Sequence, residues 1–374
     1  MQTESVDEAR RQIEICNACR YCEGYCSVFP AINRKRFFGG GDITQLANLC
    51  HNCRGCYYAC QYTEPHEFAL NLPQALAKVR QDSWQEYASP SVLAKAFHKS
   101  GVAMALATVL GFALVLWAIR TLGEDARGGE GFYAVLSHNA MVAIFLPAFL
   151  FPLFSIFLSL RKYWDAVGGG PVRLSDIVSA FGSAARMKNL DGGHGDGCNF
   201  EDEDRFSHAR RWRHQMVMYG FLLCFAATCV ATVMHYLFDR PAPYGFFSLP
   251  KLLGVPGGIL LSVGTLAMIE LKLRSDRALA DSSVWGGEMA FTLLLFFVSA
   301  SGLALYAFGG TAALTALMAL HLGAVLAFFL LTPYSKMAHG FYRLTALVKE
   351  AQDQNPPNLI APAARVDKQK QLRA

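Results

Sequence analysis

Six long apolar runs follow one another in the second part of the chain. They comprise residues 101–119, 138–160, 215–238, 252–271, 288–308 and 314–333. Each run approaches the ~20 residues that a helix needs to cross the hydrocarbon core of a bilayer. The alternative is a large soluble protein with buried helices, but six such runs in succession are difficult to shield from water. The pattern therefore predicts an α-helical polytopic membrane protein with six transmembrane helices.

Basic residues are distributed unevenly over the loops between these runs. They gather in residues 160–215, in residues 271–288 and after the sixth run, whereas residues 122–137 contain only Arg127. Cytoplasmic loops of membrane proteins carry the excess of Lys and Arg. This distribution predicts that both termini are cytoplasmic. The net charge of +5 is small and its basic residues lie beside apolar segments, so we expect no nucleic-acid partner.

The chain divides into four segments by composition. Residues 1–66 hold eight of the 11 cysteines, and residues 67–100 are predicted to form a connecting helical segment. The membrane domain then takes residues 101–345, and residues 346–374 form a cytoplasmic basic tail. A disulfide-stabilised secreted protein would be short, with cysteines along its whole length. A dense block of cysteines in a long chain favours metal ligation instead.

The cysteines of the first 66 residues repeat one spacing. Two C-x2-C-x2-C-x3-C runs are present: Cys16, Cys19, Cys22 and Cys26, then Cys50, Cys53, Cys56 and Cys60. In bacterial ferredoxins with this spacing, three thiolates of a run bind one [4Fe–4S] cluster and the fourth binds the other. The motif thus predicts a ferredoxin-like domain with cluster 1 on Cys16, Cys19, Cys22 and Cys60, and cluster 2 on Cys50, Cys53, Cys56 and Cys26. Zinc is the alternative, but structural zinc sites usually pair two C-x2-C knuckles. Ser27 and Gln61 stand where ferredoxins usually have proline.

Five histidines lie within or at the ends of the apolar runs, where a polar side chain is costly. They are His138, His214, His235, His321 and His339. The third run leads outward and the sixth inward, so His214 shares the cytoplasmic level with His339, and His235 shares the outer level with His321. Two helices that offer histidines at matched levels predict bis-histidine ligation of haem b.

The number of haems and the outer ligand pair stay open at this point. His235 follows His214 by 21 residues, a rise of about 31 Å, which is long for two haems in one bilayer. His138, at the outer end of the second run, is an alternative ligand. Interfacial histidines with polar tips in the headgroup region are the other interpretation. Tyr334, Lys336 and Arg343 near the inner site fit a cytoplasmic anchor better than a quinone pocket.

Three parts of the chain resemble the tricarballylate/citrate-utilization protein B family. They are residues 49–62, residues 214–215 with 219–228, and residues 333–336 with 339–340. The resemblance covers nearly the whole chain, and the membrane half is also similar to the gamma subunit of respiratory nitrate reductase, a haem b anchor. It implies a bacterial inner-membrane protein. Such a protein would accept electrons from a soluble FAD-dependent dehydrogenase of tricarballylate or a citrate-related compound, and pass them through clusters and haem b to the membrane quinone pool.

The sequence offers no evident catalytic acid, base or nucleophile for an organic substrate. We therefore expect an oxidoreductase subunit whose partner flavoprotein carries out the substrate chemistry. A tricarboxylate transporter is an alternative, favoured by Pro147, Pro152 and Pro256 within the runs but opposed by the lack of an arginine inside any run. A redox-sensing membrane protein is the third possibility, and no output domain is recognisable for it.

Overall fold

The computed structural model describes residues 3–26, 28–122, 133, 135–192, 195–199, 205–277, 279 and 282–355. Over these residues the regular structure is helical, apart from an isolated β-bridge between Cys198 and Ser207. The helices are α1 (Glu4–Cys19), α2 (Val28–Asn33), α3 (Gly40–Leu49), α4 (Gly55–Tyr58), α5 (Leu72–Tyr87), α6 (Ser91–Leu122), α7 (His138–Ala166), α8 (Leu174–Arg186), the 3-10 helix η3 (Lys188–Leu190), α9 (Ala209–Phe238), α10 (Leu249–Arg274), α11 (Ser282–Phe308), α12 (Leu314–Leu331) and α13 (Ala338–Gln354).

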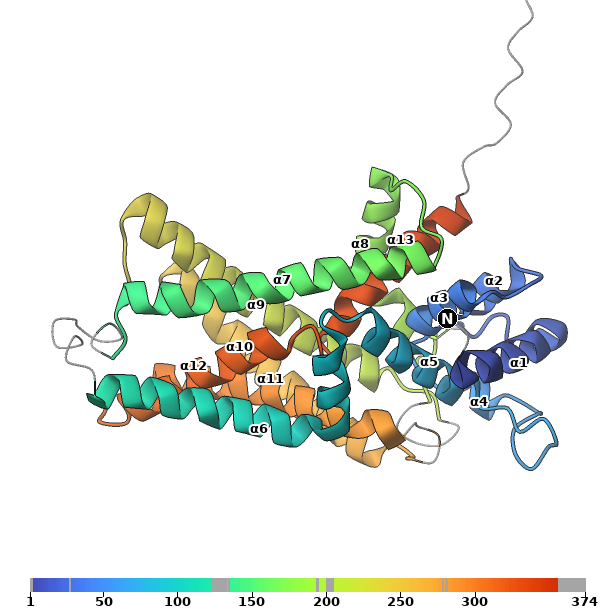
Figure 1. Cartoon of the computed structure of the whole chain (residues 1–374), viewed down its shortest axis with the longest axis horizontal. Coiled ribbons are helices and arrows are strands. Elements are labelled where there is room, and N and C mark those ends of the chain that lie inside the picture. The colour runs from blue at the N-terminus through green and yellow to red at the C-terminus, as the bar shows by residue number, and fades with distance from the viewer. Residues whose placement is uncertain are drawn as a thin grey trace, which may run out of the picture.

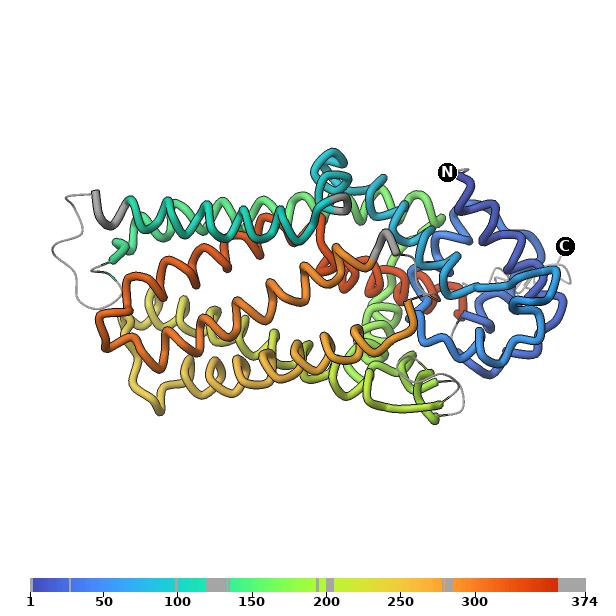
Figure 2. Tube along the Cα trace, turned by 90° about the horizontal axis from the view of Figure 1, so that it is seen from below, coloured from blue at the N-terminus to red at the C-terminus, as the bar shows by residue number. Residues whose placement is uncertain are grey.

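Six of the described helices are long and apolar enough to cross a membrane: α6 from Ser100 onward, α7, α9, α10, α11 from Trp285 onward, and α12. They run side by side along the long axis of the molecule (Figure 1 and Figure 2). Large apolar side chains such as Leu114, Phe154 and Leu237 point out of this bundle. An apolar outer surface is what a lipid-facing bundle requires. The six predicted runs are therefore confirmed as membrane-length helices, compatible with a multi-pass membrane protein.

The prolines within the bundle do not break its helices. α7 continues through Pro147 and Pro152, and α10 continues through Pro256. Ser100 in α6 does have non-helical backbone angles, but it lies at the start of the first span. The midplane helix breaks that are typical of transporters are therefore not found at these prolines.

The N-terminal helices, the end of α7 and α13 share one hydrophobic core at the end of the bundle. Ile13 of α1, Ile43 of α3, Tyr163 of α7 and Ala346 of α13 are all buried in it. Figure 1 shows α13 leading from the bundle into the N-terminal helices. The cysteine-rich block is thus packed directly on the membrane half.

The border predicted at residues 66/67 falls in the loop before α5, whereas the border predicted at residues 345/346 falls inside α13. α5 packs against α1 and α3, and Trp84 Nε1 donates a hydrogen bond to Asn48 Oδ1 at 2.9 Å, so α5 belongs with the N-terminal block. α13 continues to Gln354, past the border predicted at residues 345/346. Its charged side chains are satisfied by ion pairs, because Glu350 binds Arg34 at 2.5 Å. Residues 356–374 of the predicted tail lie outside the described residues.

Candidate functional site

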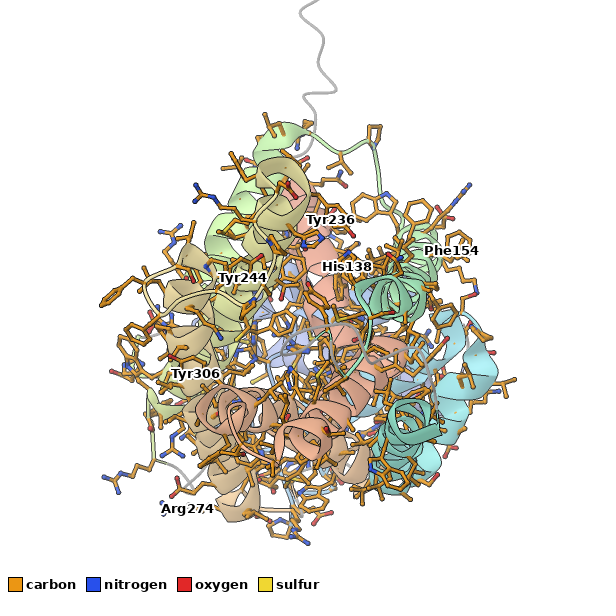
Figure 3. The ribbon with its side chains drawn as sticks, turned by 90° about the vertical axis from the view of Figure 1, so that its left-hand side faces the viewer. His138, Phe154, Tyr236, Tyr244, Arg274 and Tyr306 are labelled. Carbon is orange, nitrogen blue, oxygen red and sulfur yellow. The ribbon has the colours of Figure 1, made fainter. Side chains whose placement is uncertain are left out.

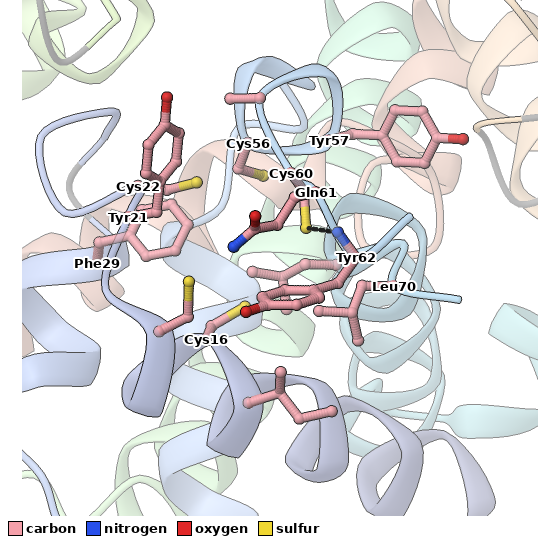
Figure 4. A pocket seen from close by; sticks show the side chains of 14 residues that line it. Cys16, Tyr21, Cys22, Phe29, Cys56, Tyr57, Cys60, Gln61, Tyr62 and Leu70 are labelled. Carbon is pink, nitrogen blue, oxygen red and sulfur yellow. Dashed lines mark hydrogen bonds between the residues drawn. The ribbon is translucent and has the colours of Figure 1, made fainter. Parts of the chain in front are cut away.

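The first group of cysteines surrounds an open cavity of about 210 Å³. Its lining includes Cys16, Cys19, Cys22 and Cys60, together with Cys56. α1 supplies the first two of these residues, the turn after α1 supplies the third, and the segment after α4 supplies Cys60. In Figure 4, labelled cysteines from both runs surround this one cavity. The fold therefore brings Cys60 to the first run, as the ferredoxin spacing predicts.

The second group surrounds a smaller, more enclosed cavity lined by Cys26, Cys50, Cys53 and Cys56. Cys56 lines both cavities; apart from its place in the first, each cavity combines three cysteines of one run with the fourth cysteine of the other. Within the described residues, no three His, Cys, Asp or Glu side chains are arranged to hold a single metal ion. A [4Fe–4S] cluster needs a wider cage, because each thiolate binds its own iron. The cysteines around each cavity are the donor set of such a cluster, and the number of clusters and the ligand assignment stay predictions.

Burial keeps most of these thiols protonated when no metal is bound. Burial and the neighbouring thiols, Cys60 foremost, raise the pKa of Cys16 to about 12. Burial also raises the pKa of Cys56 well above its usual range. A thiol must lose its proton to bind a metal, so iron binding here releases protons. The positive charge of the iron then stabilises the buried thiolates in place of water.

Cys53 differs from the other ligands because a ninth cysteine lies against it. A hydrogen bond with Cys198 lowers the pKa of Cys53 to about 6, and the backbone N–H of Asn199 donates to the carbonyl oxygen of Cys53 at 3.0 Å. Cys198 is buried. Nothing near Cys198 in the sequence resembles a cluster motif, so sequence reasoning did not connect it with the second cavity.

Three arginines from distant segments converge on the loop that carries the second group. Arg80 of α5 and Arg343 of α13 each donate to the carbonyl oxygen of Cys50, both at 2.7 Å. Arg210 of α9 donates to the carbonyl oxygen of Asn52 at 2.7 Å. Burial and the nearby Arg80 lower the pKa of Arg343 to about 9. Such a concentration of positive charge needs a counter-charge, and a cluster bound by four thiolates is negatively charged.

Two of these arginines lie one helical turn from the predicted inner haem ligands. Arg210 precedes His214 by four residues on α9, and Arg343 follows His339 by four residues on α13. Residues four apart lie on the same face of a helix. The helix faces that hold the Cys50–Asn52 backbone therefore also carry the two histidines.

The structure brings His214 and His339 together, with ring centroids 5.8 Å apart and ring planes at 81°. His339 Nδ1 donates to the carbonyl oxygen of Lys336, which leaves Nε2 as the nitrogen that could bind a metal. His214 Nδ1 is buried without a hydrogen-bond partner. Burial, then the charge of Lys336, lowers the pKa of His339 well below its usual range, so its imidazole is neutral. Two neutral imidazoles, one with an unsatisfied buried nitrogen, fit axial ligation of a haem iron.

At the outer level, His235 lies against His138. Their rings stack with centroids 4.3 Å apart, and His138 Nε2 lies 2.9 Å from the hydroxyl oxygen of Tyr236. Figure 3 views the molecule from this end and shows His138 and Tyr236 close together. The predicted partner of His235 at this level was His321, with His138 as the alternative ligand.

His321 makes a different contact. Its Nδ1 lies 3.1 Å from Oγ of Ser301 on α11. Its ring also packs on Gly302, where an added Cβ would lie 2.9 Å from the ring. The sequence gives the depth of a histidine in the membrane, but the helix that it faces depends on the rotation and packing of whole helices. The outer haem ligands therefore stay a prediction.

The basic and phenolic groups near the inner histidines are engaged in structural contacts. Lys336 and Lys272 both bind the carboxylate of Glu288, which joins α10, α11 and the turn between α12 and α13. The Tyr334 hydroxyl donates to the carbonyl oxygen of Ser89 at 3.1 Å. These contacts favour the anchoring role over a quinone pocket for Tyr334 and Lys336.

Comparison with known proteins agrees with this architecture. Residues 91–358 match the family model described as Citrate utilization protein B, and residues 9–88 match the model described as Citrate utilization protein B Fer4-like domain. The chain is 42% identical over 355 residues to Citrate utilization protein B of Escherichia coli, covering 93% of each protein. The chain belongs to the citrate utilization protein B family.

The family resemblance noted in the sequence is thereby confirmed. The Fer4-like match indicates an iron–sulfur function for the N-terminal block, and its end at residue 88 assigns α5 to this citrate utilization protein B domain. No solved structure matches the chain.

Proposed function

We propose that this citrate utilization protein B homologue is the membrane-bound electron-transfer subunit of a flavoprotein dehydrogenase. It receives electrons from a soluble FAD-dependent partner and passes them through two [4Fe–4S] clusters and haem b to the quinone pool. The Escherichia coli relative is described as a citrate utilization protein, and the proposed partner accordingly oxidises a citrate-related compound such as tricarballylate. When bound, the clusters and the haem supply one-electron transfer, while the polypeptide sets their distances and potentials.

The observation that carries this proposal is the order of the sites along the molecule. The cavity of cluster 1 is open, and Cys19 and Tyr21 at its rim are exposed. The cavity of cluster 2 is more enclosed, and its loop is bonded to Arg210 and Arg343. Next along these two helices come His214 and His339. This order supports a route from a soluble donor at cluster 1, through cluster 2, to an inner haem.

The orientation is part of the same proposal. With the basic loops in the cytoplasm, the cysteine-rich block faces the compartment where a soluble dehydrogenase would be found. The inner histidines then lie at the cytoplasmic side of the bacterial inner membrane, and His138 and His235 lie at the periplasmic side.

A single-turnover experiment tests the function without the flavoprotein. The full chain, purified anaerobically and placed in lipid nanodiscs, is reduced with dithionite, freed of excess reductant and mixed with a menaquinone or ubiquinone analogue. Oxidation of the haem and clusters, with formation of one quinol for every two electrons, is the expected result. Centres that stay reduced in the presence of excess quinone contradict the proposed acceptor.

A further inference from the structure

The connection between α7 and α9 contains a helix with three distinct faces, α8. Asp176 and Ala180 are buried on the side that packs on α13. Ser175 and Ser179 are exposed on a polar side. The third side is both apolar and exposed, and we call it the apolar face of α8; it comprises Leu174, Ile177, Val178 and Phe181. This i, i+3, i+4, i+7 spacing forms one continuous stripe, which a protein surface in contact with water rarely shows.

The direction of α8 differs from that of the membrane-length helices. Both Figure 1 and Figure 2 show α8 lying crosswise to α7 and α9, near the end of the bundle that carries the N-terminal block. In a bundle that spans the bilayer, a crosswise helix at this end lies along the membrane surface. An amphipathic helix in that position is the usual form of an interfacial membrane helix.

Hydrogen bonds fix the depth of α8 along the bundle. The Tyr219 hydroxyl of α9 donates to the carbonyl oxygen of Ala185 at 2.8 Å, and Arg211 donates to the carbonyl oxygen of Arg186 at 3.0 Å. Arg213 is the last charged residue of α9, and Tyr219 lies six residues farther along, about 9 Å into the apolar segment. The end of α8 is therefore held at the depth where headgroups give way to acyl chains.

We propose that the apolar face of α8 is a lipid-binding surface, inserted at the headgroup boundary of the cytoplasmic leaflet. The bundle also exposes large apolar side chains, such as Phe154 and Phe157 of α7. Exposed basic residues near it suit the anionic headgroups of that leaflet. These are Arg161 and Lys162 at the end of α7, and Arg186 and Lys188 at the end of α8.

This contact also has a consequence for the cluster-binding block. α8 packs on α13, and α13 carries Arg343, which is bonded to the Cys50 carbonyl oxygen. Lipid bound at α8 thus holds α13 in place on the bundle. It thereby also holds the loop of cluster 2, which is bonded to α13. The proposal requires the membrane location of the six helices but is independent of the redox partners.

Site-specific photocrosslinking tests the lipid contact directly. p-Benzoylphenylalanine is placed at Phe181 on the apolar face or at Ser179 on the polar face as the matched control. The full chain is assembled in nanodiscs of phosphatidylethanolamine and phosphatidylglycerol, and adducts are identified by mass spectrometry after illumination. We expect at least about fivefold more lipid adduct at position 181 than at position 179, since an inserted face excludes water. Unchanged cluster and haem spectra verify the fold of each variant.

Several outcomes overturn the proposal. Equal lipid adducts at the two positions would mean that α8 lies on the surface without insertion. Adducts from position 181 to a second copy of the chain, or to added flavoprotein partner, would make the face a protein-docking surface. If the change at Phe181 prevents folding, the probe moves to Val178, for which the same ratio to position 179 is expected.

Discussion

The two ends of the helical bundle carry histidines in very different surroundings. At the inner end, His339 is oriented by the Lys336 carbonyl, and His214 keeps a buried nitrogen without a partner. At the outer end, the rings of His138 and His235 stack and His138 Nε2 lies near the Tyr236 hydroxyl, while His138 Nδ1 is likewise buried without a hydrogen-bond partner. The inner site is also joined to the cysteine block through arginines, whereas the outer histidines contact one another, aromatic rings, Ser301 and Gly302. The inner pair is thus connected by hydrogen-bonded arginines on its own helices to the cysteine-rich block, which supports its proposed place on the electron route.

Removal of an inner ligand has the largest expected effect. We expect His214→Ala to abolish the low-spin b-type haem spectrum of the inner site, because it removes one of the two imidazoles of this pair. The clusters should persist, since their cysteines lie on other segments. Reduced-minus-oxidised visible spectra and electron paramagnetic resonance measure the two together. His208→Ala, at the N-cap of the same helix, is the control, and an unchanged inner haem signal in His214→Ala would mean that this pair does not bind haem.

The arginines offer a smaller and more specific change. Arg343→Gln removes a positive charge near cluster 2. Reduction makes a cluster more negative, so losing this charge disfavours the reduced form and lowers the potential, by on the order of 50 mV. A redox titration followed by electron paramagnetic resonance measures this shift. Arg11→Gln, on the exposed side of α1, should leave cluster 2 unchanged, and equal shifts in both variants would remove the special role of Arg343.

Part of this comparison was predictable from the sequence and part was not. The spacing of the cysteines predicts the crossed cavities because local chain geometry governs which thiols meet, and hydropathy predicts the six long helices. The inner pair follows from depth alone, since His214 and His339 share one level. The three arginines and Cys198 come from segments far apart in the sequence. Their meeting depends on tertiary packing that has no local signal, as does the contact of His138 with His235.

At the outer end we expect a partial effect. His138→Ala should leave the inner haem spectrum intact and lower the ratio of haem to protein by no more than half, because the two levels do not share ligands. Pyridine haemochrome analysis against protein concentration gives this ratio. Complete loss of haem in this variant would show that His138 belongs to the essential ligand pair. The outer histidines, and not the inner pair, would then be the main haem ligands.

The smallest expected effect concerns the contact between Ser301 and His321. Ser301→Ala removes one buried hydrogen bond and should lower the free energy of unfolding by about 1 kcal/mol. The inner haem potential should not change. Thermal unfolding in nanodiscs and a haem redox titration report these two quantities. A large shift of a haem potential would instead identify Ser301 as a residue that orients a haem-ligating His321.

The central claim is that the cysteine block holds two [4Fe–4S] clusters on the route to a membrane haem. Iron and acid-labile sulfide analysis of the anaerobically purified full chain, with a visible spectrum of the same sample, tests it most directly. The account predicts about eight non-haem irons and about eight sulfides per chain, together with the absorption bands of haem b. Stoichiometric zinc without sulfide, or clusters without any haem, would contradict it.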